Sequence, residues 1–75
     1  MAILVDYQKV REDENQVEYR FGAPEMNRRL VIDKGDRRGS PADGTADRKF
    51  EVVLGKILRQ HRDTETWPEG GTYAA

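Results

Sequence analysis

The chain has no cysteine among its 75 residues, and His61 is its only histidine. A disulfide is therefore excluded, and so is a zinc site made of thiolates or of several imidazoles. A domain this small, without disulfides or a structural metal, often gains stability by associating with itself, because it buries a small share of its surface. We predict no metal and no cofactor, and a homodimer is one expectation.

An excess of charge of either sign is also lacking. The chain has 13 basic and 14 acidic residues, for a formal net charge of -1. A general nucleic-acid binder carries a large basic excess, so this balance argues against one. The balance leaves open a local basic face on one element.

Long apolar runs are absent as well. The run at residues 2–5 ends at Asp6 and is too short for the core of a signal peptide or for a membrane span. Without an export signal and without cysteine, the protein is expected in the cytoplasm, and we expect no contact with a membrane.

The residue patterns that carry catalysis are incomplete. Gly39, Gly44 and Thr45 have the spacing of a phosphate-binding loop, but the lysine that should precede the threonine is missing. Asp63 and Glu65 are near His61 in the sequence, but helical geometry does not place Asp63 on the same face, where it could orient the imidazole as a general base. Acidic and arginine side chains on the predicted sheet are expected to form cross-strand ion pairs. We therefore predict that the protein is not an enzyme and assign no catalytic residue.

The clearest positive signal is a helical stripe near the C-terminus. Apolar positions recur with the spacing of one helical face: Phe50, Val53, Leu54, Ile57, Leu58 and His61. Thr45 or Asp47 is the expected N-cap, and the helix is expected to run to about Arg62.

Three segments before this helix alternate between apolar and polar residues. They span residues 3–10, 17–21 and 29–33, and short polar breaks separate them, which is typical of half-buried antiparallel strands. We predict an α+β fold, a three-stranded antiparallel β-meander with one C-terminal α-helix packed on one face (βββα), in a single domain of residues 1–63. Its predicted core combines the helical stripe with Ile3, Val5, Tyr7, Val17, Tyr19, Phe21, Leu30 and Ile32.

Residues 64–75 are interpreted as a tail. They contain the only tryptophan, Trp67, followed by Pro68 and two glycines. Because a tryptophan gains from burying its large apolar area, we expect the tail to fold back through Trp67. A second interpretation stays open, in which Trp67 anchors a partner or a second subunit, since tryptophan is enriched at binding hot spots.

The outer side of the predicted helix is basic and carries a small apolar contact. The candidate partner-contact residues are Trp67, Val52, Gly55, Arg48, Arg59 and Arg62. A glycine inside a helix lets another backbone approach closely. We predict a small non-enzymatic binding or accessory protein that acts through protein–protein contacts, with itself or with another protein. The alternative is a nucleic-acid-associated regulator that uses the arginines of this face on phosphates.

Four short stretches together resemble a group of small bacterial proteins of about this length. They are Leu4-Val5-Asp6-Tyr7, Tyr19-Arg20-Phe21-Gly22, Leu30-Val31-Ile32-Asp33 and Trp67-Pro68-Glu69. No activity is established for that group, so the resemblance implies no function and no site residue. It implies that the chain is a complete natural protein rather than a fragment.

Overall fold

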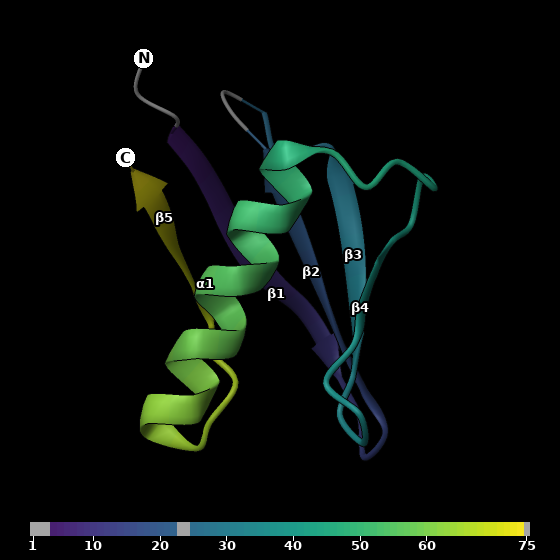
Figure 1. Cartoon of the computed structure of the whole chain (residues 1–75), viewed down its shortest axis with the longest axis vertical. Coiled ribbons are helices and arrows are strands. Elements are labelled where there is room, and N and C mark those ends of the chain that lie inside the picture. The colour runs from purple at the N-terminus through teal and green to yellow at the C-terminus, as the bar shows by residue number, and fades with distance from the viewer. Residues whose placement is uncertain (1–3, 23–24, 75) are drawn as a thin grey trace.

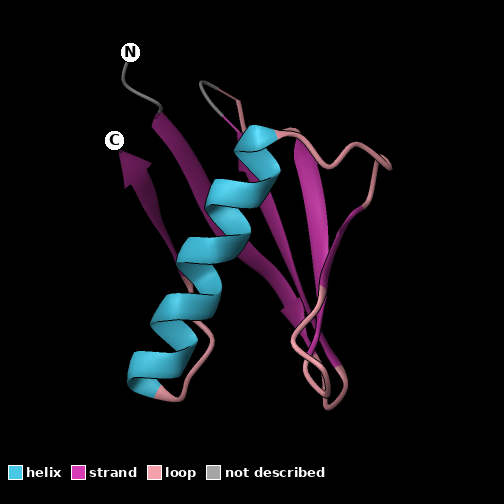
Figure 2. Ribbon diagram, viewed as in Figure 1, coloured by secondary structure: helices cyan, strands magenta, loops and turns pink. Residues whose placement is uncertain are grey.

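The protein folds into a five-stranded antiparallel sheet with one helix across one face, as the computed structural model shows for residues 4–22 and 25–74 (Figures 1 and 2). The elements are β1 (Leu4–Glu12), β2 (Gln16–Gly22), β3 (Arg28–Asp33), β4 (Gly39–Pro41), α1 (Arg48–Thr64) and β5 (Gly70–Ala74). The α+β prediction is confirmed. Ile3, which is predicted to belong to the core, lies outside the described residues.

The predicted number of strands is wrong. β1, β2 and β3 are neighbours in chain order, as a meander requires, but the full strand order is β4-β3-β2-β1-β5. β4 forms within the stretch expected to be irregular and pairs with β3, whereas β5 forms within the predicted tail and pairs with β1. Each added strand lacks an alternating pattern of its own. It forms because the neighbouring strand offers an unpaired row of backbone donors and acceptors.

The core lies between α1 and the sheet face that the helix covers. Its buried side chains come from β1, β2, β3 and α1: Val5, Tyr7, Val17, Tyr19, Phe21, Leu30, Ile32, Phe50, Val53 and Ile57. Leu54 and Leu58 are partly buried and pack against this cluster, and His61 is half-buried. The predicted stripe is therefore the face of α1 that meets the sheet. Within the described residues, no helix is long and apolar enough to cross a membrane.

The start of α1 is fixed by Asp47, one of the two predicted caps. Its carboxylate accepts the backbone N–H of Phe50 at 3.0 Å. Arg28 at the start of β3 donates to Asp47 at 2.8 Å and to Asp43 at 2.9 Å, and its guanidinium lies 4.8 Å from the centre of the Phe21 ring. The Phe50 N–H and the Arg28 guanidinium hold the pKa of Asp47 below its ordinary value. The sheet thereby sets where the helix begins.

The sheet face away from α1 is polar and internally paired. Glu18 accepts from Arg11 at 2.8 Å and from Arg29 at 3.1 Å. Burial raises the pKa of Glu18, but the hydrogen bonds from the two arginines outweigh it and the pKa is lowered. The expected cross-strand ion pairing is present here, with carboxylate and arginine side chains neutralising each other.

Candidate protein-contact groove between α1 and β5

Trp67 fixes the segment that leads from α1 into β5. Its ring stacks on His61, with the ring centres 4.0 Å apart and the planes inclined by 21°, and it packs against the core cluster. Trp67 is partly buried and His61 is occupied by the stack. The pair therefore sets the turn from helix to strand, and the tryptophan ring is engaged within its own chain.

Two core tyrosines hold this segment from the sheet side. The Tyr19 hydroxyl donates to the Pro68 carbonyl, and the Tyr7 hydroxyl donates to Oε1 of Gln60, each at 2.6 Å. Burial raises the pKa of both hydroxyls, so they stay protonated donors. A Cβ atom on Gly71 would come 2.7 Å from the Tyr7 hydroxyl oxygen. Glycine is therefore the residue that lets β5 lie against Tyr7.

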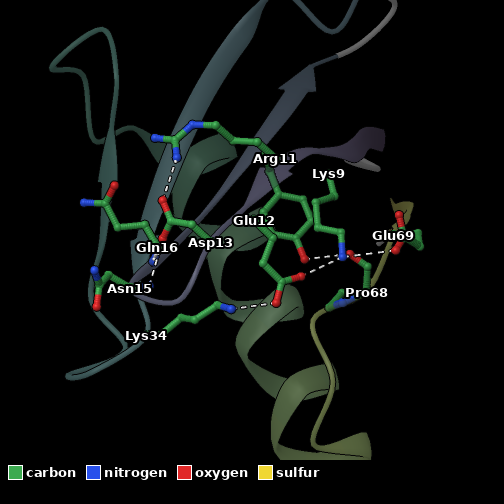
Figure 3. Close-up of polar contacts among 10 residues, drawn as sticks. Lys9, Arg11, Glu12, Asp13, Asn15, Gln16, Lys34, Pro68 and Glu69 are labelled. Carbon is green, nitrogen blue, oxygen red and sulfur yellow. Dashed lines mark hydrogen bonds and ion pairs between the residues drawn. The ribbon is translucent and has the colours of Figure 1, made fainter.

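A network of four charged side chains ties the start of β5 to β1 and β3 (Figure 3). Glu12 accepts from Lys34 at 2.6 Å and from Lys9 at 2.8 Å, and Lys9 also reaches Glu69 at 3.0 Å. The hydrogen bonds from Lys34 and then Lys9 lower the pKa of Glu12. The hydrogen bond to Glu12 is the main cause that raises the pKa of Lys9. Glu12 is thus the shared anion of the network.

Glu12 is expected to make the fold more stable at neutral pH than in acid. Because its folded pKa lies below the ordinary value of 4.5, its contribution is complete above that value and is lost as the pH falls through the folded pKa. We expect Glu12→Gln to cost roughly 1 kcal/mol at neutral pH, since the pairs are partly exposed. Urea unfolding of wild type and Glu12→Gln at pH 7 and at about pH 3 measures the free energy of unfolding of each protein. The variant should lose less stability on acidification than wild type. Equal losses in both proteins would contradict this role.

A groove of about 530 Å³ runs between α1 and β5. Its lining comes from one side of the helix and the end of the strand: Val52, Gly55, Lys56, Arg59, Gln60, Asp63, Tyr73 and Ala74. Both polar and apolar groups line it, with two cations and one carboxylate on the helix side. Gly55 leaves open space on the helix side of the groove, because a Cβ atom there would meet nothing within 4 Å. Such a site suits an extended polypeptide better than a small molecule.

Comparison with known proteins assigns nothing to this groove. No family model, curated protein or solved structure matches the chain. The chemistry of the groove therefore rests on its own residues. Among residues 4–22 and 25–74, no three histidine or acidic side chains are arranged to hold a metal ion.

The structure gathers half of the predicted contact residues and separates the others. Val52, Gly55 and Arg59 line the groove together. Arg62 lies next to them, in a smaller hollow of about 320 Å³ that it shares with Arg37, Gly55, Leu58 and Arg59. Arg48 lines a different hollow, near Arg28 and the loop before α1.

The sequence prediction missed the strand side of the groove. The sequence pattern predicts a tail at Tyr73 and Ala74, whereas both belong to β5 and form one wall of the groove. Threonine and tyrosine favour strands, and this local signal was present. The preceding proline and two glycines obscured it, because such residues are typical of loops.

Proposed function

We propose that this protein is a non-enzymatic accessory protein that binds another polypeptide through the α1–β5 groove. The supporting observation is the coincidence of an edge strand, β5, with a neighbouring groove whose helix side is left open at Gly55. An extended segment gains main-chain hydrogen bonds from an edge strand, and its alternate side chains then need a groove beside it. The α1–β5 groove offers both requirements on adjacent elements.

The lining of the groove determines which side chains a bound segment is expected to have. Val52, Tyr73 and Ala74 offer apolar contact, while Lys56 and Arg59 offer positive charge. A bound segment with apolar or aromatic side chains facing the groove fits this lining. Because the cations lie on the helix side, polar or acidic groups of the segment would face α1.

We rank nucleic-acid binding second. The hollow lined by Arg37, Arg59 and Arg62 supports it, whereas Arg48 lines a different hollow. Phosphate binding along a strand needs a continuous row of cations. Salt-dependent binding of labelled DNA or RNA by the wild-type protein would reverse this order. We also propose the cytoplasm as the compartment, since a chain without cysteine gains nothing from an oxidising one.

Two substitutions of Gly55 test the groove. Both Gly55→Ala and Gly55→Arg replace a helix-interior glycine by a good helix former, and each is expected to raise the free energy of unfolding by about 0.5–1 kcal/mol. Only the arginine side chain is long enough to fill the groove. Quantitative capture from extracts of the source cell, with urea unfolding of each variant, measures both effects.

The expected pattern is retention of the captured partner by Gly55→Ala and at least about tenfold weaker capture by Gly55→Arg. The alanine variant is the matched control, because it shares the gain in helix stability. Equal capture by the two variants would remove the groove as the binding surface.

A further inference from the structure

β5 lacks the two features that protect the opposite edge of the sheet, a proline and a length of only three residues. β4, the other edge strand, has three residues and includes Pro41, which has no N–H to donate. β5 has five residues, Gly70–Ala74, and none of them is charged or proline. Figure 1 places β5 at the outer edge of the sheet, beside β1. An edge strand without charge and without proline can pair with another strand.

The hydrogen-bond pattern shows which residues of β5 offer their backbone outward. The Lys9 N–H donates to the Glu69 carbonyl at 2.7 Å, and the antiparallel register continues from there with Gly71 opposite Tyr7 and Tyr73 opposite Val5. In an antiparallel pair, alternate residues direct their N–H and C=O groups to the same neighbour. Residues 69, 71 and 73 therefore face β1, and residues 70, 72 and 74 face away from it.

We propose that the strand accepted by this edge is β5 of a second copy of the chain, paired antiparallel about a twofold axis at Thr72. This inference rests on the proposed function and names its partner. The outward residues 70, 72 and 74 are symmetric about Thr72, so one register satisfies both copies: Thr72 faces Thr72, and Gly70 faces Ala74. A surface that matches itself in this way is what a twofold interface requires. The two sheets join into one sheet of ten strands.

The side chains on the helix side fit this register. Between the hydrogen-bonded pairs, Tyr73 of each copy stands opposite Gly71 of the other. Side chains lie closest at such positions of an antiparallel ladder. A glycine there leaves room for the facing tyrosine ring, and the groove of about 530 Å³ lies next to it, between α1 and the end of β5. The uncharged sequence of β5 places no like charges opposite each other along the new ladder.

The charges beside the groove give the dimer a distinctive salt dependence. Each copy brings Lys56 and Arg59 to the groove and only one acid, Asp63. Two such linings repel each other, so screening by salt is expected to tighten the dimer. Binding of an acidic partner at the same place would weaken with salt instead.

The test uses two substitutions at Thr72, whose N–H faces outward. Thr72→Pro removes that outward donor and leaves every β5–β1 backbone bond in place, and proline is tolerated on an edge strand. Thr72→Val is the matched control: it keeps the N–H and, like the proline variant, loses the 2.7 Å hydrogen bond from the Thr72 hydroxyl to Asp6. Sedimentation equilibrium gives the dissociation constant of each protein at about 0.05 M and about 0.5 M NaCl.

We expect wild type and Thr72→Val to dimerise, more tightly at high salt, and Thr72→Pro to raise the dissociation constant about tenfold or more. Amide hydrogen exchange provides an independent readout. Gly71 and Tyr73 should be protected at every concentration, while Gly70, Thr72 and Ala74 become protected only as the dimer forms.

A wild-type chain that stays monomeric at millimolar concentration overturns the dimer, and so does a Thr72→Pro variant that dimerises like wild type. These results are separable from the proposed function. If the monomeric wild type still captures a partner that Gly55→Arg loses, the groove keeps its function and only the second copy is excluded. If capture by Gly55→Ala and Gly55→Arg is also equal, both proposals fall.

Discussion

Replacing Trp67 by alanine is expected to lower the free energy of unfolding by about 2–3 kcal/mol, which corresponds to a fall in melting temperature of roughly 10 °C or more for a domain of this size. The substitution removes the ring that stacks on His61 and packs against the core. Its cost lies below that of a fully buried tryptophan, because Trp67 is only partly buried. The substitution removes contacts that hold the turn between α1 and β5.

We expect Trp67→Ala to destabilise β5 more than the rest of the sheet. In Trp67→Ala the amides of Gly71 and Tyr73 should exchange faster than in wild type, whereas amides of β2 at the centre of the sheet should change only with the global stability. Leu4→Ala is a suitable control, because Leu4 is 57% exposed and its truncation should have little effect. Because Trp67 is the only tryptophan, unfolding is followed by circular dichroism. Unchanged protection of Gly71 and Tyr73 would show that Trp67 does not hold β5.

Each element that is predicted correctly has a residue pattern within its own segment that identifies it. The stripe from Phe50 to His61 repeats over three turns of helix, and Asp47 supplies a cap at its start. β1, β2 and β3 each bury alternate residues on one face. Local patterns of this kind can be recognised in a single sequence, because the periodicity follows from the geometry of the element itself.

The two edge strands could not be predicted in the same way. β4 has three residues, and β5 has Gly70 and Gly71 at positions that normally weaken a strand. What makes β5 a strand is outside its own sequence: Trp67 on His61 and the Tyr19 hydroxyl on Pro68 bring it to β1. Such contacts join residues far apart in the chain, so the periodicity of a segment does not reveal them.

The residues of the candidate site also fall into two groups, those that a local pattern reveals and those that depend on contacts far apart in the chain. Val52, Gly55 and Arg59 were found because helical spacing assigns them to the side of α1 away from the stripe. Tyr73 and Ala74 were missed because their place depends on β5 joining the sheet. Trp67 was selected for its size, and the structure places it in a stack within the chain. A groove between two elements can be predicted from the sequence only when both elements are themselves predicted.

Gly71→Ala is expected to have the opposite effect to the same substitution at Gly55. The added methyl group would lie 2.7 Å from the Tyr7 hydroxyl oxygen and 3.0 Å from Cζ of the ring. Tyr7 is 2% exposed and its hydroxyl is bonded to Gln60, so the ring cannot move without breaking that bond and disturbing the core. We expect a loss of about 2 kcal/mol, made up of overpacking and an unsatisfied hydroxyl.

Comparing Gly71→Ala with Gly55→Ala separates this clash from any general effect of removing a glycine. At Gly55 the methyl group meets open space and supports the helix, so stability should rise, while at Gly71 it should fall. The double variant Gly71→Ala with Tyr7→Phe tests the mechanism, because removing the hydroxyl relieves the closest contact. Its cost should be smaller than the sum of the two single costs, as measured by urea unfolding. Additive costs would show that the Tyr7 hydroxyl is not what excludes a side chain at position 71, and that β5 is held against β1 by its other contacts alone.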